Sequence, residues 1–258
     1  MTVSTTRDSR GVATVTVARP GKLNVLDAPA AEALIAAFAA LAADPALRVV
    51  ILRGEGERAM IGGADIDAMA GLAPATARGF ITLIHRCCDA LRACPAPVIA
   101  RCAGYTLGAG LEIAAAADLR IAAADAKFGM PETRIGIPSV VEAALLPGLI
   151  GWGRTRRLLL TGEIIDAARA EAWGLVEETV APERLDAAVA ALVDALLGAG
   201  PNALRLQKRL IRDWEALSPD QAVQRGIDAF VESWESPEPA AMMAAFQAAR
   251  RRRKAAGG

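Results

Sequence analysis

The sequence has no long hydrophobic run and few aromatic residues. Of its 258 residues, 53% are apolar and only 4% are aromatic, and much of the apolar excess is alanine. No uncharged apolar stretch approaches the roughly 18 residues that a membrane-spanning helix requires. The first ten residues are polar and contain no apolar segment of the kind found in secretory signals. We therefore expect a soluble, cytoplasmic protein with no membrane partner.

The sequence also has no excess of charge of either sign. It contains 29 basic and 29 acidic residues, whereas a protein built around nucleic acid carries a basic excess. We therefore do not expect nucleic acid as a partner. One basic run occupies residues 250–254. It is interpreted either as a solvated tail or as a docking site for a phosphate or another acidic partner.

Residue types that build metal sites and nucleophilic sites are scarce. His85 is the only histidine, so a Ser-His-Asp triad or a multi-histidine metal site would depend on it alone. A single helical histidine is more often structural, and we favour that interpretation. The four cysteines form no C-x-x-C pair and are expected to be reduced residues in or near the core. They are Cys87, Cys88, Cys94 and Cys102. We predict no metal site and no separate cofactor.

The order of the expected elements indicates an α/β core. Short β-branched segments bounded by glycine or proline predict strands, and alanine-rich segments predict helices. Asp27 is the expected N-cap of the first helix. We expect strands at residues 12–17, 49–52, 98–100 and 119–122 and around Phe128, and helices at 28–43 and 76–93.

Helices dominate the rest of the chain. After about residue 161 strand-like segments almost vanish, except around residues 177–180. Helices are expected at 166–172, 182–197, 203–216, 219–233 and 239–253. We divide the chain into a core of residues 1–195 and a helical C-terminal region of residues 196–258. Its aromatic residues need a partner surface, on the core or on a neighbouring subunit. These residues are Trp214, Phe230, Trp234 and Phe246.

Two segments pair a glycine-rich turn with a following helix. They are residues 58–69 and residues 104–112. Small residues let a backbone approach a ligand closely, and helix N-termini present unpaired N–H groups. Two such N–H groups that converge on one point could hold a developing oxyanion. The alternative is that both segments are ordinary helix caps in tightly packed turns.

Two glutamates are candidates for acid/base chemistry. Glu112 lies within a strongly apolar run, where an isolated carboxylate is costly to bury. Such burial usually marks a paired or functional group. Glu132 follows Pro131 on an expected loop or helix start. Their spacing alone permits a Glu112–Glu132 acid/base pair without establishing one.

Taken together, these segments resemble the crotonase superfamily, also called the enoyl-CoA hydratase/isomerase family. Any one motif is modestly specific, but their order along nearly the whole chain is strongly so. The matching segments are residues 19–26 (RPGKLNVL), 62–66 (GGADI), 104–112 (GYTLGAGLE), 128–132 (FGMPE), 159–162 (LLTG) and 172–176 (AWGLV).

The resemblance implies an α/β fold, a crotonase-like spiral of ββα units with a helical C-terminal trimerisation region. It further implies a homotrimer or a hexamer that is a dimer of trimers, and an acyl-CoA thioester as substrate, so that coenzyme A is part of the substrate and not a cofactor. The implied oxyanion-hole donors are the backbone N–H groups of Ala64 and Ala109. The implied CoA-binding residues are Lys22, Leu23, Ala64 and Ile66. Asp65 is expected to cap the following helix.

The resemblance also implies a reaction. Hydratases of this family use a carboxylate at each of two positions, and Glu112 and Glu132 match both. Water addition to a 2-enoyl-CoA needs a base for the water and an acid for C2. Having both glutamates favours a hydratase, a lyase that forms or dehydrates a 3-hydroxyacyl-CoA. The alternatives are another crotonase reaction, such as Δ3–Δ2 isomerisation, and a non-catalytic acyl-CoA- or RNA-binding relative.

The sequence departs from the family pattern after Pro138. The family's hydratases usually have a glycine-rich run here, whereas this chain has Ser139, Val140, Val141 and then Glu142. This stretch is expected beside the acyl group. We therefore place Met69, Pro138, Val140 and Glu142 in the expected acyl pocket. Glu142 is interpreted either as a surface or helix-start residue, or as a third acid/base or substrate-recognition group.

Overall fold

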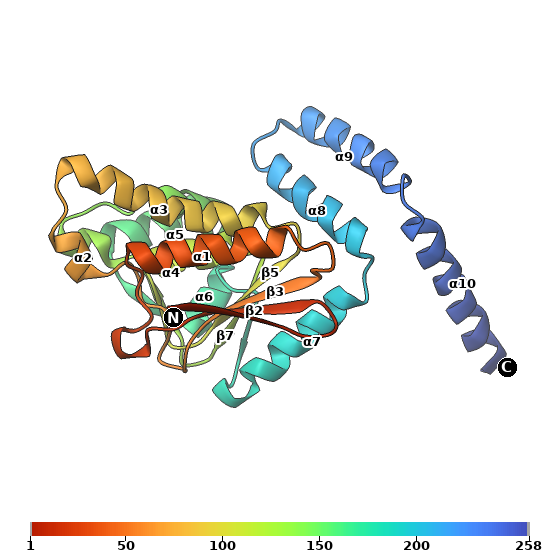
Figure 1. The fold of residues 1–258 in the computed structure, drawn as a ribbon, viewed down its shortest axis with the longest axis horizontal. Coiled ribbons are helices and arrows are strands. Elements are labelled where there is room, and N and C mark those ends of the chain that lie inside the picture. Colours follow the sequence, from red (N-terminus) through yellow and green to blue (C-terminus); the bar gives the residue numbers. More distant parts are fainter. Residues whose placement is uncertain (1, 257–258) are drawn as a thin grey trace. The chain divides into compact units, whose positions relative to one another are not determined.

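The structure is a computed structural model that describes residues 2–256, with side chains as far as Arg253 (Figure 1). The side chain of Lys254, part of the basic run, lies outside the described residues. The chain forms two compact units, Met1–Asp194 and Ala195–Gly258. The first is the mixed α/β spiral expected from the sequence, and the second is helical.

The first unit is built around two sheets. The larger sheet has the strand order β1-β2-β3-β5-β7-β10 and the smaller one the order β4-β6-β8-β9. The strands of the larger sheet are β1 (Val3–Arg7), β2 (Val12–Val17), β3 (Val49–Gly54), β5 (Val98–Cys102), β7 (Leu119–Ala123) and β10 (Glu178–Val180). Those of the smaller sheet are β4 (Ala59–Ile61), β6 (Tyr105–Leu107), β8 (Lys127–Gly129) and β9 (Ile164–Asp166).

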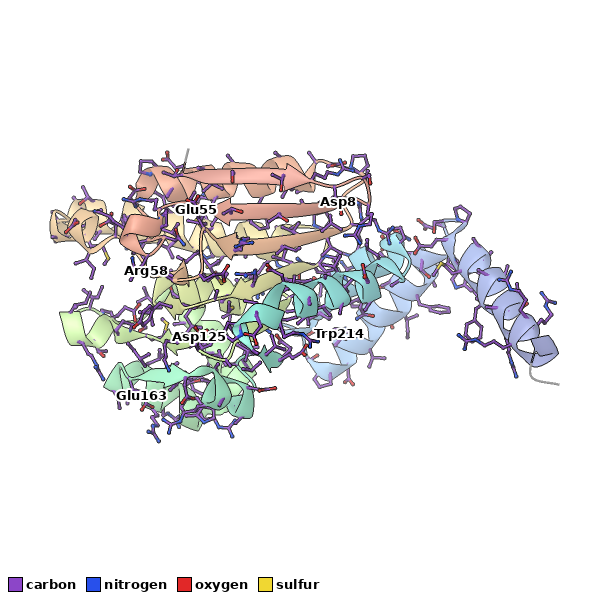
Figure 2. All side chains as sticks on the ribbon, turned by 90° about the horizontal axis from the view of Figure 1, so that it is seen from below. Asp8, Glu55, Arg58, Asp125, Glu163 and Trp214 are labelled. Atoms are coloured by element: carbon purple, nitrogen blue, oxygen red, sulfur yellow. The ribbon has the colours of Figure 1, made fainter. Side chains whose placement is uncertain are left out.

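From β3 to β8 consecutive strands alternate between the two sheets, which gives the spiral. β3, β5 and β7 pair in parallel in the larger sheet, and the strand that follows each of them, β4, β6 or β8, pairs in parallel in the smaller sheet. β1 and β9, each at the edge of its sheet, pair antiparallel with β2 and β8. Figure 2 shows Asp8, in the turn before β2, and Glu55, just beyond β3, at opposite ends of the larger sheet. The carboxyl ends of the parallel strands of each sheet therefore lie at the same edge of that sheet.

The helices of the first unit cover the sheets. α1 begins after Asp27, whose side chain accepts a hydrogen bond from the N–H of Ala30 at 2.9 Å, and it packs against α3 (Figure 1). Phe38 of α1 and Leu91 of α3 are fully buried between these elements and the sheet. The helices are α1 (Ala28–Ala42), α2 (Ile66–Ala70), α3 (Pro74–Ala93), α4 (Ala109–Ala116), α5 (Leu146–Thr161), α6 (Ala167–Trp173) and α7 (Leu185–Leu197).

The second unit consists of the helices α8 (Pro201–Trp214), α9 (Pro219–Ser233) and α10 (Glu238–Ala256). α8 packs against α9, and the indole N–H of Trp214 donates to the carbonyl of Ala222 at 3.1 Å. Many large apolar side chains of this unit are exposed, among them Phe230, Trp234 and Phe246. Within the described residues no single helix is long and apolar enough to cross a membrane. One bent pair of neighbouring helices would be long and apolar enough, judged by length and composition alone.

Candidate active site

Three neighbouring parallel strands of the smaller sheet end at one edge, and the segment that follows each strand contributes to one cavity. β4 leads into Gly62, Gly63 and Ala64, β6 leads into Gly108 and Ala109, and β8 leads into Pro131 and Glu132. The cavity has a volume of about 510 Å³. The fold thereby brings together the two glycine-rich segments and both candidate glutamates, which the sequence separates by up to 70 residues.

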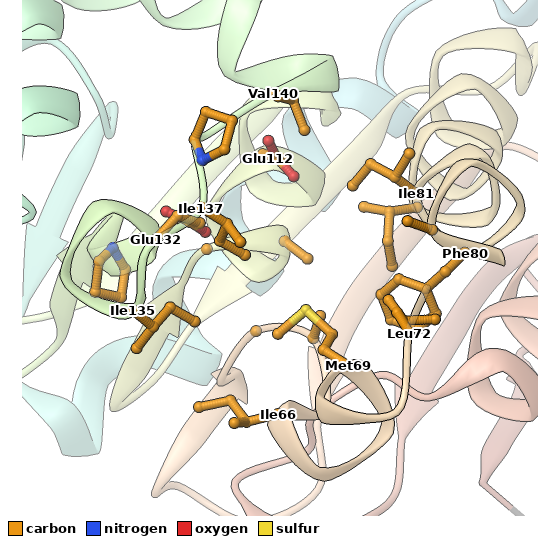
Figure 3. Close-up of a pocket in the computed structure, with 18 of the residues that line it drawn as sticks. Ile66, Met69, Leu72, Phe80, Ile81, Glu112, Glu132, Ile135, Ile137 and Val140 are labelled. Carbon is orange, nitrogen blue, oxygen red and sulfur yellow. The ribbon is translucent and has the colours of Figure 1, made fainter. Parts of the chain in front are cut away.

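Glu112 lies in the first turn of α4, deep in the cavity (Figure 3). It is only 4% exposed, and the N–H of Ala143 donates to its Oε1 at 3.3 Å. Burial, together with the nearby negative charge of Glu132, raises the pKa of Glu112 to about 8. At neutral pH Glu112 therefore favours its protonated form.

Glu132 lies in the 3₁₀ helix Pro131–Ile135 and is less buried than Glu112. The hydroxyl of Ser139 donates to its Oε2 at 2.9 Å. Burial raises the pKa of Glu132, and the Ser139 hydrogen bond opposes that increase by stabilising the carboxylate. Because the two carboxyl groups influence each other, they titrate as a pair. A pair that holds one proton supplies one acid and one base.

Two residues that line the cavity have a backbone N–H group without an acceptor among the described residues. Leu26 forms a parallel bridge with Ala64 that uses the carbonyl of Gly63 and the N–H of Asp65. The N–H of Ala64 therefore points away from Leu26 and, within the described residues, has no acceptor. The N–H of Ala109, the first residue of α4, also has no acceptor in the described part of the chain. Two free donors at one cavity wall can hold a carbonyl oxygen that gains negative charge.

The wall opposite the glutamates is largely apolar, although Arg78 of α3 also lines the cavity. It is formed by side chains of α2, of α3 and of the loop between them, with a second apolar group around residues 135–140 (Figure 3). Met69, Pro138 and Val140, placed in the acyl pocket from the sequence, line the cavity. Sequence reasoning missed the contribution of α3, which comes mainly from Phe80, Ile81 and Ile84. The spacing of these residues is that of any amphipathic helix, so it does not show whether they line a pocket or belong to the core.

Comparison with known proteins agrees with this geometry. Residues 7–246 match the family model described as enoyl-CoA hydratase/isomerase. The chain belongs to the enoyl-CoA hydratase/isomerase family. It is 36% identical to the crotonyl-CoA hydratase of Syntrophomonas wolfei over 85% of each chain, and 32% identical to the short-chain-enoyl-CoA hydratase of Clostridium acetobutylicum over 91% of this chain and 90% of that protein. The crystal structure of an enoyl-CoA hydratase from Bacillus anthracis superposes with a TM-score of 0.92 at 30% identity and covers 96% of each chain.

Membership of this family confirms the resemblance, the crotonase-like α/β fold and the expectation of an enzyme. The roles of individual residues stay predictions. Lys22 and Leu23, expected to bind CoA, lie beside the cavity and do not line it, whereas Ile66 lines it and is 60% exposed. Lys22 forms an ion pair with Asp67 at 2.9 Å. Asp65 caps α2 as expected, because its side chain accepts a hydrogen bond from the N–H of Asp67.

Glu142 is at a helix start, as one of its two interpretations expected, because it lies in the first turn of the 3₁₀ helix Val141–Leu145, but it is not in the acyl pocket. It is neither a surface residue nor one of the residues that line the cavity, because it is only 8% exposed and points toward α3. Its Oε1 lies 2.7 Å from Nδ1 of His85. The sequence carries no signal for this contact, because His85 and Glu142 are 57 positions apart.

The cysteines match their prediction, since all four are buried free thiols. Burial raises the pKa of Cys87 and of Cys102 to about 12. Both thiols therefore stay protonated at neutral pH and are poor nucleophiles. Among the described residues, no group of three or more histidine, cysteine, aspartate or glutamate side chains is arranged to hold a metal ion.

Proposed function

We propose that this protein adds water across the C2=C3 bond of a 2-enoyl-CoA thioester to give a 3-hydroxyacyl-CoA, and that it catalyses the reverse dehydration. The observation that carries the proposal is the meeting of Glu112, Glu132 and the free N–H groups of Ala64 and Ala109 at one cavity. Two relatives that are 32% and 36% identical over most of the chain are named as hydratases of this kind.

The reaction follows from these groups. The N–H groups of Ala64 and Ala109 donate to the thioester oxygen and stabilise the negative charge that develops on it. The ionised carboxylate of the pair takes one proton from water while the water oxygen bonds to C3. The protonated carboxyl of the pair gives its proton to C2 of the enolate. One water molecule is added, and the pair still holds one proton, now on the other carboxyl group.

The remaining parts of the substrate follow from the cavity walls. The acyl group lies against the apolar side chains of α3 and of the stretch that ends at Val140. The CoA portion leaves the cavity past Ile66 toward Lys22 and Leu23. We further propose that exposed apolar residues of α8–α10 cover one another in a homotrimer or hexamer. A cytoplasmic location and the lack of a separate cofactor stay predictions.

The test is the loss of the conjugated enoyl-thioester absorbance when the protein meets crotonyl-CoA and a panel of longer and branched 2-enoyl-CoAs. Glu112→Gln and Glu132→Gln each remove one acid/base group without changing its size, so we expect each to lower kcat by about 100- to 10,000-fold. Glu171→Gln changes an exposed glutamate of α6 and is the matched control.

Product analysis separates this proposal from its alternatives. A 3-hydroxyacyl-CoA product supports hydration. Migration of the double bond in a 3-enoyl-CoA without water uptake would identify an isomerase. Binding of acyl-CoA with no turnover of any substrate would identify a non-catalytic relative, and both results would overturn the hydratase proposal.

A further inference from the structure

Glu142 is a buried carboxylate that the proposed reaction does not use. It is in the first turn of the 3₁₀ helix Val141–Leu145, and only 8% of the residue is exposed. Its Oε1 faces Nδ1 of His85 at 2.7 Å, and its Oε2 is buried without a hydrogen-bond partner in the described part of the chain. A buried carboxylate oxygen that lacks a donor is costly, and such groups call for an explanation.

The backbone around Glu142 connects it directly to the active site. Ala143, the next residue, donates its N–H to Oε1 of Glu112 at 3.3 Å. Val141, the residue before, has a φ of +39°, a region that β-branched residues rarely adopt. A strained turn keeps its geometry only where surrounding contacts hold it. The His85–Glu142 contact ties this turn to α3, and Ala143 on the same turn contacts Glu112.

The charges around Glu142 come from two helices. α3 contributes His85 and the thiols of Cys87 and Cys88, and α4 contributes Glu112. Burial raises the pKa of both thiols, to about 12 for Cys87, so they are neutral near pH 7. His85 has a side chain that is 52% exposed, and it connects the buried carboxylate to the surface. The negative charge of Glu142 raises the pKa of Glu112 in addition to the effects of burial and Glu132.

We propose that Glu142, held by His85, is a positioning residue for Glu112. The His85–Glu142 pair fixes the turn that presents the N–H of Ala143 to Glu112, and the charge of Glu142 holds the proton on Glu112. Glu142 does not touch the substrate, because it does not line the cavity. The kinetic consequences rest on the proposed function, whereas the effect on the proton of Glu112 does not.

Two variants separate the charge of Glu142 from its tether. Glu142→Gln keeps the size of the side chain and an oxygen that accepts from His85, but removes the charge. His85→Leu removes the tether and keeps Glu142. His85→Asn provides a side-chain N–H near the position of Nδ1 and is the conservative variant. Glu171→Gln, on the exposed face of α6, is the control for a glutamate-to-glutamine change.

The first readout needs no substrate. In protein that carries ¹³C-labelled glutamate carboxyl groups, NMR titration follows Glu112, whose signal is assigned by its absence in Glu112→Gln. We expect Glu142→Gln to lower the pKa of Glu112, because it removes a nearby negative charge that favours the protonated form. Glu171→Gln has no such effect. An unchanged titration of Glu112 in a folded Glu142→Gln variant would overturn the proposal.

The second readout is the pH profile of kcat/KM. The alkaline limb, where the pair loses its last proton, moves to lower pH in Glu142→Gln. His85→Leu lowers kcat by about 10- to 100-fold with little change in KM, since misplacement of a catalytic group has this effect, and His85→Asn restores part of the loss. Equal loss in both His85 variants, in step with lower thermal stability, would overturn the positioning role. If the parent protein turns over no enoyl-CoA, the proposed function fails, and the NMR titration still decides this inference.

Discussion

The carboxylate of Glu132 packs directly against the α-carbon of Gly108. A β-carbon added at Gly108 would overlap Oε1 of Glu132 and come within 3.9 Å of the α-carbon of Gly63. Gly108 also has a φ of +51°, which side-chain-bearing residues rarely adopt. Gly108 directly precedes α4, which carries Glu112. The position of the Glu132 carboxylate therefore depends on Gly108 having no side chain.

Gly108→Ala is expected to displace Glu132. We predict a loss of kcat/KM of about 100-fold, because an error of about 1 Å in a catalytic group has this effect. Gly56→Ala is the matched control, since Gly56 also has a positive φ, +70°, but an added β-carbon there meets nothing within 4 Å. Both variants place a side chain at a positive φ, so steady-state kinetics together with thermal unfolding separate this conformational effect from displacement of Glu132. Equal activity losses in the two variants would contradict the prediction.

Most of the fold could be predicted from local patterns. β2 and α9 have the expected bounds, and Asp27 caps α1 as expected. The strands β1, β4, β6 and β9 and the helix α5 were missed, β4 and β6 because they lie next to glycine-rich turns that dominated the pattern. β1 is a largely exposed edge strand whose residues after Val3 are polar or small, so it carries no run of buried side chains. β9 has only three residues, too few for an alternating pattern, and it is a second short strand beyond residue 161 besides the expected one around residues 177–180.

The site could be predicted only in part. Glu112 and Glu132 follow from the family resemblance, because each stands in a recognisable motif. The contacts that hold these two glutamates or their neighbours in place cannot be predicted in this way. Ser139 reaches Glu132 across a turn, and His85 meets Glu142 from a helix 57 residues away. Such contacts depend on how α3 packs over the 3₁₀ helix Val141–Leu145, which no local periodicity encodes.

The raised pKa of Glu112 predicts a stability cost at alkaline pH. Burial raises this pKa from an ordinary 4.5 to about 8, so the folded state binds the proton more tightly than the unfolded chain does. The stabilising effect of that proton is complete below about pH 4.5 and is lost as pH rises through about 8. Each unit of the shift corresponds to about 1.4 kcal/mol. We therefore expect Glu112→Gln to unfold at a higher temperature than the parent at pH 9.

The measurement is thermal unfolding of the parent, Glu112→Gln and Glu171→Gln between pH 5 and pH 9. The advantage of Glu112→Gln should grow with pH, because glutamine carries no charge to bury. Glu171→Gln should follow the parent at every pH, since Glu171 is exposed. Parallel curves for Glu112→Gln and the parent would show that burial of Glu112 does not depress stability at high pH.

Removal of one oxyanion donor gives a third prediction. Ala109 is the first residue of α4, a position where proline is well tolerated and which proline already occupies in α3, α8 and α9. Ala109→Pro removes the N–H, and we expect kcat/KM to fall by about 100- to 1000-fold. Ala109→Gly removes only the methyl group and should cost much less. Thermal unfolding shows whether each variant is folded, and equal losses would speak against a role for the N–H.

The acyl wall gives the last prediction, which concerns substrate preference. Ile81 of α3 lines the cavity, whereas Leu83, two residues further along the same helix, does not. Ile81→Ala enlarges the space beside the acyl group. We therefore expect kcat/KM for longer or branched 2-enoyl-CoAs to rise relative to kcat/KM for crotonyl-CoA. The ratio of their kcat/KM values should change by about tenfold or more, the usual effect of a few methylene groups in an apolar pocket. Leu83→Ala removes a similar volume from α3 outside the cavity and should leave the ratio near that of the parent. If both variants shift the ratio alike, the change reflects a loosened helix, and the acyl group does not lie against Ile81.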